Sequence, residues 1–153
     1  MSALLEPGFE FVFELRVQVD DPVPIGRSAS EDLQFTPITG GEAAGPRLTG
    51  RVRAGGGDWW VARGDTVQLD ARYVLETDDG RVDVVNRGYW RASPEAADRL
   101  FAGGSATEEE LYYRTAFVFQ TDAPALRWLA ESQFVGYARP EPGLVCIRVF
   151  RLT

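Results

Sequence analysis

Tyrosine and asparagine side chains occupy the apolar faces of two neighbouring predicted strands, where they could do chemistry. Residues 66–78 and 81–90 alternate apolar and polar side chains, and the Asp-Gly pair at 79–80 favours a two-residue turn between them. That turn would pair Tyr73 directly with Asn86 on the apolar face. A phenol can donate a proton and a carboxamide can bind a carbonyl or hydroxyl, so the pair could line a ligand pocket. Alternatively, the two side chains satisfy each other inside an ordinary core.

A third predicted strand, residues 111–121, has the same character. Tyr113 and Thr115 share its apolar face with phenylalanine side chains. They could extend the polar part of the same pocket, and Trp59 or Trp128 could lie near its mouth. A bound ligand is therefore expected to contact Tyr73, Asn86 and Tyr113.

Charged side chains follow the opposite face of the predicted hairpin. Asp70 is two residues from Arg72, and Arg87 lies diagonally across from it. The favoured interpretation is an exposed ladder of ion pairs, and the alternative is a catalytic Asp–Arg pair. Arg114 follows Tyr113 in sequence and could lower the pKa of a nearby phenol, although strand alternation assigns it to the other face. The catalytic hypothesis thus names Tyr73 and Asn86, with Asp70 or Arg114 as further candidates.

The composition excludes several kinds of chemistry. The chain has no histidine, and all sixteen basic residues are arginine, which removes histidine-based nucleophile systems, lysine Schiff bases and imidazole metal sites. We therefore expect no metal and no cofactor. Sixteen arginines against twenty-three acidic residues, with a net charge of −7, argue against nucleic-acid or anionic-membrane partners. The single cysteine and the lack of a signal-peptide pattern favour the cytoplasm.

The elements that would position these residues are mostly strands. The 153 residues suit one domain, residues 1–153, without an internal linker. Helices are predicted at 94–102 and 124–132, where Pro94 and Pro124 begin them. Strands are predicted at residues 9–19, 33–39, 47–53, 58–63, 66–78, 81–90, 111–121, 133–139 and 144–152. Because several are long, we expect an all-β fold, an antiparallel β-barrel of about eight to ten strands with two short helices in its connections.

Short motifs distributed along residues 9 to 152 resemble a known family. They lie at 37–41, 45–50, 57–59, 69–73, 77–80, 86–88, 112–115, 128–129 and 134–136. Their order and spacing resemble the domain of unknown function 3237 family, whose members are uncharacterised. The resemblance implies a lipocalin-like antiparallel barrel that often self-associates, acting in bacterial or fungal small-molecule metabolism, including natural-product pathways. The chain departs from the family pattern at Ala130 and at Tyr137, whose bulk would narrow a pocket.

Three functions follow from these observations. The first is a cofactor-independent enzyme, an isomerase, cyclase or lyase, that acts on an apolar or aromatic metabolite by acid–base or shape catalysis. Its substrate contacts would include Tyr113, Thr115, Trp59, Trp128, Tyr137 and Arg72. The second is a small-molecule-binding or carrier barrel without chemistry, and the third is a structural oligomerisation module whose barrel is packed solid. In each case a homodimer or higher oligomer is expected.

Overall fold

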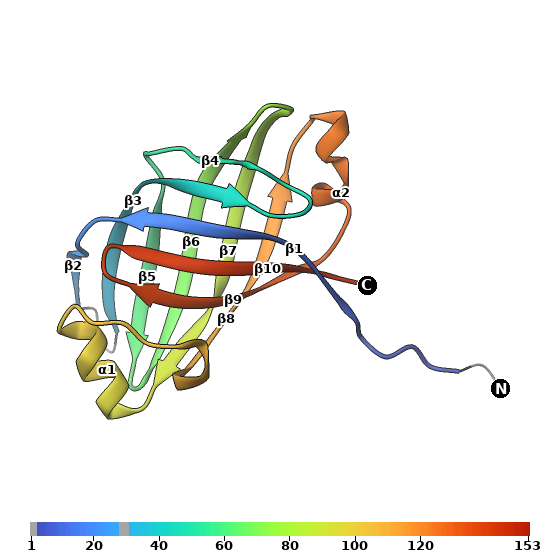
Figure 1. Cartoon of the computed structure of the whole chain (residues 1–153). Helices are drawn as coiled ribbons and strands as arrows, with labels where there is room; N and C mark the ends of the chain where they lie inside the picture. Colours follow the sequence, from blue (N-terminus) through green and yellow to red (C-terminus); the bar gives the residue numbers. More distant parts are fainter. Residues whose placement is uncertain (1–2, 28–30) are drawn as a thin grey trace.

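Long alternating strands close on themselves into a β-barrel. The computed structural model describes residues 3–27 and 31–153, and its strands enclose a common interior (Figure 1). They are β1 (Phe9–Val19), β2 (Val23–Arg27), β3 (Asp32–Ala44), β4 (Gly50–Val52), β5 (Gly57–Arg63), β6 (Thr66–Thr77), β7 (Gly80–Ala92), β8 (Leu111–Gln120), β9 (Phe134–Glu141) and β10 (Leu144–Leu152). The expected all-β antiparallel barrel is confirmed.

Eight strands form the barrel wall, and two short strands are added to it. The antiparallel order runs from β1 through β10, β9, β8, β7 and β6, and pairing of β1 with β3 closes the ring. Both β4 and β5 lie between β3 and β6, each along a different part of their length. β2 pairs with the first residues of β3. The sequence did not predict β2, because its proline is unfavourable for a strand inside a sheet.

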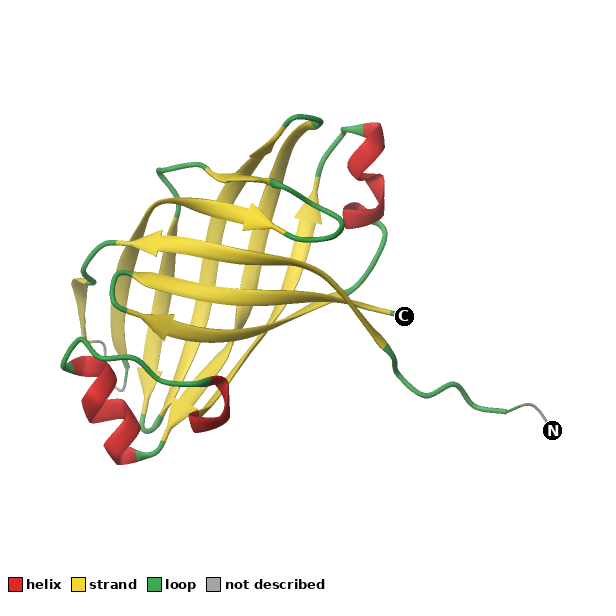
Figure 2. Ribbon diagram, viewed as in Figure 1, coloured by secondary structure: helices red, strands yellow, loops and turns green. Residues whose placement is uncertain are grey.

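Short helices lie at opposite ends of the barrel (Figure 2). α1 (Pro94–Phe101) begins at Pro94, as the sequence predicted, and the Ser93 hydroxyl accepts a hydrogen bond from the Ala96 amide at 3.2 Å. A turn of 3₁₀ helix, η1 (Glu108–Glu110), precedes β8. The predicted helix 124–132 is a 3₁₀ turn, η2 (Pro124–Leu126), followed by α2 (Arg127–Ala130). Among the described residues, no helix is both long and apolar enough to span a membrane.

Aromatic side chains fill the barrel end beneath α2. The Phe119 ring lies 6.0 Å from Phe13 and 5.0 Å from Phe134, and Trp128 lies 5.8 Å from Phe134. Leu129 of α2 is buried against this cluster. The solid part of the core is therefore at the α2 end, which leaves the α1 end of the barrel for a pocket.

The hairpin β6–β7 has the predicted faces but a different register. Its two-residue turn is Asp78-Asp79 instead of the expected Asp-Gly pair, so Tyr73 pairs with Val84 and Asn86 pairs with Ala71. The hydroxyl of Thr77 sets this turn by accepting from the Asp79 and Gly80 amides and donating to the Gly80 carbonyl. The predicted direct pairing of Tyr73 with Asn86 is wrong. A shift of two residues preserves side-chain direction, however, so both remain inside as diagonal neighbours.

A bulge in β1 changes which of its residues face inward. The pairing with β10 shifts between Phe11 and Phe13, which leaves both Val12 and Phe13 buried. Phe9 and Phe11 consequently point outward and are exposed. The uninterrupted alternation expected for residues 9–19 is therefore broken at one position.

Candidate functional site

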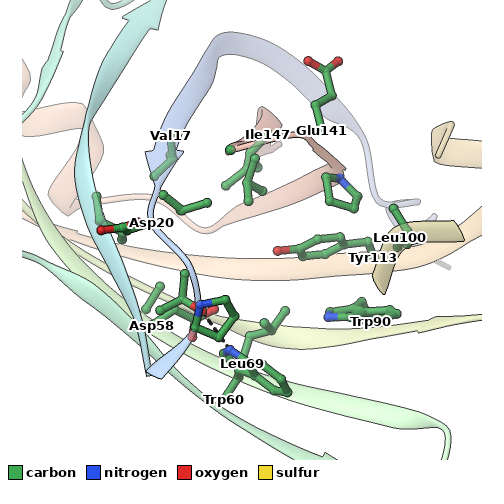
Figure 3. A pocket seen from close by; sticks show the side chains of 18 of the residues that line it. Val17, Asp20, Asp58, Trp60, Leu69, Trp90, Leu100, Tyr113, Glu141 and Ile147 are labelled. Atoms are coloured by element: carbon green, nitrogen blue, oxygen red, sulfur yellow. Dashed lines mark hydrogen bonds between the residues drawn. The ribbon is translucent and has the colours of Figure 1, made fainter. Parts of the chain in front are cut away.

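The barrel contains a pocket of about 320 Å³ at the end covered by α1. Leu100 and Phe101 of α1 contribute to its rim, together with residues 140–143, which are the end of β9 and the turn to β10. Figure 3 shows Tyr113 reaching into the pocket from one wall, with Asp58 on the facing wall. A volume of this size is at the lower end of small-molecule sites.

Three polar side chains inside the pocket have hydrogen-bonding atoms without a partner. Tyr73, Asn86 and Thr115 are buried and lie on β6, β7 and β8 respectively. The Tyr73 hydroxyl, Asn86 Oδ1 and Thr115 Oγ1 each lack a protein partner, and all three residues line the pocket. An unsatisfied buried polar group costs about 1–3 kcal/mol. Three buried polar atoms without partners in one pocket are typical of a site that binds a polar part of a ligand.

Asp58 adds a carboxylate to this cluster. It lies on β5 opposite Thr36 of β3 and Ala71 of β6, and Oδ1 accepts a hydrogen bond from the Asp70 amide at 2.9 Å. Removal of the carboxylate from water raises the pKa of Asp58 from 3.8 to about 6. The amide hydrogen bond opposes that rise, and the charge of Asp70 adds to it. At neutral pH Asp58 is thus mostly ionised yet close to its pKa, which suits a general base.

The two pocket tyrosines are proton donors. Burial raises the pKa of both Tyr73 and Tyr113 well above the ordinary value, and the negative charge of Asp58 raises both further. Each phenol therefore keeps its proton at neutral pH. A tyrosinate base, which the sequence allowed, is disfavoured by this environment, and Asp58 is the pocket group whose pKa suits a base.

Close packing of neighbouring strands positions Thr115. A Cβ atom on Gly136 would lie 2.5 Å from Thr115 Oγ1 and 2.7 Å from the Phe117 ring. On the other side, a Cβ on Gly88 would lie 2.1 Å from the Arg114 carbonyl oxygen. Glycine on both flanking strands thus lets β7, β8 and β9 approach closely enough to hold the Thr115 side chain at the pocket wall.

Tryptophans form the apolar part of the wall. The Trp60 indole donates a hydrogen bond to Thr36 Oγ1 at 2.9 Å, which fixes its ring in the pocket. Trp90 also lines the pocket, with its ring centroid 6.2 Å from that of Phe101. An aromatic wall beside a compact polar cluster suits a flat, mostly apolar ligand that carries one polar end.

The structure brings together four of the residues that the sequence named. Tyr73, Asn86, Tyr113 and Thr115 all line the pocket. Trp128 does not, because it packs at the α2 end, where the Arg47 guanidinium lies 4.2 Å from its ring centroid.

The other candidates lie on the outer face of the barrel. Asp70 accepts from Arg87 Nε at 3.0 Å, and Arg72 Nη2 lies 3.2 Å from an Asp83 carboxylate oxygen. These ion pairs are exposed, in agreement with the favoured interpretation, and Asp70 pairs with Arg87 directly instead of diagonally.

Two aromatic candidates are also outside. Arg114 lies with its guanidinium 3.9 Å from the Tyr137 ring centroid, on the outer side of β8 and β9, and Tyr137 is exposed there. Trp59 is exposed as well, with its ring 4.6 Å from Phe35. None of these three side chains lines the pocket that contains Tyr73.

Asp58 and Trp60 are site residues that sequence reasoning missed. The strand predicted at 58–63 exists as β5 (Gly57–Arg63), but the sequence analysis did not assign its two faces. Along β5, Asp58 and Trp60 share one face, and Trp59 takes the other. An acidic residue on the same strand face as an indole that lines the barrel was the available signal.

The fold and pocket define a class, a closed antiparallel β-barrel with a pocket that contains polar side chains at one end. The chain matches the family described as "Protein of unknown function (DUF3237)" over residues 7–152, and it belongs to that family. A relative described as a "UPF0311 protein" from Rhodopseudomonas palustris strain TIE-1 is 30% identical over 145 residues, covering 94% of this chain and 95% of the relative. A UPF0311 protein from Clostridium acetobutylicum is 29% identical over 159 residues, covering 100% and 99%.

Solved structures share this fold. The crystal structure of a conserved protein of unknown function from Rhodopseudomonas palustris matches with a TM-score of 0.93 and 30% identity, covering 98% of this chain and 100% of that one. A "beta-barrel like protein" from Acinetobacter baumannii matches with a TM-score of 0.85 and 26% identity, covering both chains fully. An enzyme from Penicillium herquei matches with a TM-score of 0.72 at 21% identity, covering 100% and 99%, which is a likeness of fold alone.

Proposed function

We propose that the protein is a cofactor-independent acid–base enzyme that isomerises or cyclises a small, largely apolar or aromatic metabolite. The observation that carries this proposal is a carboxylate with a raised pKa, Asp58, in one pocket with two protonated phenols. A base near its pKa beside fixed acids is the usual arrangement for proton transfer without a cofactor.

A carbonyl-containing substrate illustrates the roles. Asp58 takes a proton from the carbon next to the carbonyl, and the C–H electron pair forms a carbon–carbon double bond. The carbonyl π electrons move to oxygen, and the hydroxyl of Tyr73 or Tyr113 donates a hydrogen bond or its proton to that oxygen. Asn86 and Thr115 orient the same polar end. In a substrate with a carbon–carbon double bond one position further along, return of that proton from Asp58 to the far end of the conjugated system completes an isomerisation, and the carbonyl re-forms as its oxygen gives the proton back to the tyrosine. To close a ring, Asp58 instead takes the proton of an internal hydroxyl while that oxygen bonds to the carbonyl carbon, and the carbonyl π electrons move to the oxygen that the tyrosine protonates.

A binding or carrier barrel without chemistry is the second candidate. The unpartnered atoms of Tyr73, Asn86 and Thr115 favour it equally, because they require a ligand and do not require a reaction. A structural module with a solid barrel is disfavoured by the pocket of about 320 Å³. Asp58 distinguishes the first two candidates, since a carrier for an apolar molecule gains nothing from a carboxylate that is partly buried in its pocket.

Hydrogen–deuterium exchange tests the catalytic role directly. Neutral aryl ketones with exchangeable α-protons, such as 2-tetralone, are incubated with the protein in deuterated buffer at a pD near 7 and followed by NMR. We expect exchange above the buffer rate, a loss of about 100-fold or more in Asp58→Asn, and normal exchange in the control Asp83→Asn. Asp83 carries the same charge but lies on the outer face, paired with Arg72.

The outcome separates the candidates. If wild type and Asp58→Asn exchange every ketone at the same rate, the acid–base proposal is wrong. Retained binding of the ketones in that case would leave the carrier function.

Self-association and cellular location remain proposals. A homodimer or higher oligomer is supported by exposed Tyr112, Val118 and Tyr137 on the outer faces of β8 and β9. The cytoplasmic location expected from the single cysteine stays a prediction.

A further inference from the structure

The described residues that line the pocket include carboxylates and no basic side chain. Among the described residues that line it, Asp58 lies inside, and Asp20, Asp21 and Glu141 contribute near its mouth, while none is an arginine. Arginine is the chain's only basic side chain, because lysine and histidine are absent. Figure 3 shows Asp20, which follows β1, and Glu141, the last residue of β9, around the space that Asp58 faces. A ligand that enters the pocket therefore passes the acidic side chains at the mouth and binds next to Asp58.

The arginines that precede or follow Tyr73, Asn86 and Thr115 in sequence point to the outer surface. Arg72 and Arg87 alternate with the inward residues of β6 and β7, and both are held in exposed ion pairs. Arg114 is held over the Tyr137 ring outside the barrel. Strand alternation thus separates the two signs of charge, with cations outside and Asp58 inside.

The carboxylates are not equivalent. Glu141 has Arg139 at 3.4 Å and Arg16 at 3.9 Å, so its charge is largely balanced. Asp20 and Asp21 are exposed, and solvent screens them. Asp58 is the decisive group, because it is shielded from water and makes its hydrogen bond to a backbone amide.

The side chains facing Asp58 are neutral or acidic. Tyr73 of β6 and Tyr113 of β8 face it as protonated phenols, Thr36 of β3 is opposite it, and Asp70 of β6 adds a further negative charge nearby. Neutral hydroxyls can hydrogen-bond an anion, but they cannot offset its repulsion from an ionised carboxylate in a medium of low polarity.

We infer that this pocket takes a ligand with a hydroxyl or carbonyl at its inner end, and that it excludes molecules bearing a carboxylate or phosphate there. The inference rests on the proposed function of the pocket and names its substrate class. A second, independent observation is the set of unpartnered atoms on Tyr73, Asn86 and Thr115. Together they offer a donor, an acceptor and a hydroxyl that can act as either, which matches a neutral hydroxyl or carbonyl group.

The test uses three naphthalene probes that differ in one substituent. They are 2-naphthalenemethanol, 2-naphthylmethylammonium and 2-naphthoate, titrated calorimetrically into the full chain at pH 7.5. We expect the carboxylate to bind at least tenfold more weakly than both other probes. The ammonium probe is essential, because it loses as much hydration as the carboxylate and differs in the sign of its charge.

Two variants identify the origin of the selectivity. Asp58→Asn should bring the carboxylate to within about threefold of the ammonium probe, because it removes the interior charge and retains shape. Asp83→Asn, the matched control on the outer face, should keep the full difference. A gap that persists in Asp58→Asn would overturn the inference.

The remaining outcomes separate the inference from the proposed function. If wild type binds ammonium and carboxylate within threefold of each other, charge selection is wrong while the acid–base proposal stands. If none of the three probes binds wild type at millimolar concentration, the ligand pocket itself is wrong, and both proposals fall together.

Discussion

Replacing Asp58 with asparagine should stabilise the fold at neutral pH while it removes the proposed base. The carboxylate lies among side chains that shield it from water, and this dehydration raises its pKa from 3.8 to about 6. Asparagine has nearly the same shape, and its Oδ1 can still accept from the Asp70 amide. The substitution therefore removes the cost of a buried charge and retains the hydrogen bond.

The size and the pH range of the effect follow from linkage. Below pH 3.8 the folded and unfolded states both bind the proton, so Asp58 costs nothing. Between 3.8 and 6 the unfolded state ionises first and stability falls, and above 6 the loss reaches its limit. At about 1.4 kcal/mol per pH unit, the limit is about 3 kcal/mol. The variant should gain at most about 0.6 kcal/mol over wild type at pH 4 and about 3 kcal/mol at pH 7.5.

Urea unfolding followed by tryptophan fluorescence at pH 4, 5.5 and 7.5 measures this difference, since the pocket tryptophans change environment on unfolding. Asp83→Asn serves as the control. It breaks an exposed ion pair, so its effect should be about 0–1 kcal/mol throughout. A difference between wild type and Asp58→Asn that is the same at pH 4 and 7.5, or that falls as the pH rises, would refute the assignment of Asp58 as a dehydrated carboxylate.

Three further outcomes test the site and its support. Tyr73→Phe should weaken binding of 2-tetralone by about 5- to 100-fold while leaving urea stability equal or up to about 1–2 kcal/mol higher, because it removes an unpartnered buried hydroxyl. Gly136→Ala should cost about 1–3 kcal/mol in the same assay, since its Cβ would lie 2.5 Å from Thr115 Oγ1. Sedimentation velocity at micromolar concentration should show a dimer or larger oligomer, and a monomer would contradict the proposed association.

Much of the fold could be predicted from local pattern. Alternation of apolar and polar residues marks most of the wall strands, and Ser93 with Pro94 marks the start of α1. The register of β6–β7 could not be predicted as reliably. The Asp-Gly pair at 79–80 favours one turn, but the Thr77 hydroxyl stabilises another turn one residue earlier, which shifts the strand pairing by two residues. The choice between these two turns depends on the hydrogen bonds that the Thr77 side chain can make, and the pattern of apolar and polar residues carries no information about them.

From the sequence, only the inward or outward face of each site residue could be predicted. Parity along β6, β7 and β8 places Tyr73, Asn86 and Thr115 inside, and this conclusion survives a register shift of two residues. The parity of a residue along its strand does not determine at which end of the barrel an inward side chain lies. Trp128 was expected at the mouth and lies at the α2 end, because depth along the barrel depends on the stagger of all the strands together.

Asp58 and the three unpartnered atoms have one explanation in common, because each of them lowers the stability of the fold and all of them line the same pocket. The α2 end is packed with aromatic rings and needs no polar groups for its stability. The α1 end keeps a carboxylate that destabilises the folded state at neutral pH, and three buried atoms that each cost further stability. A barrel that had only to fold would gain from Asn at 58 and Phe at 73. Concentration of both costs in one pocket is the pattern expected when that pocket must act on a ligand.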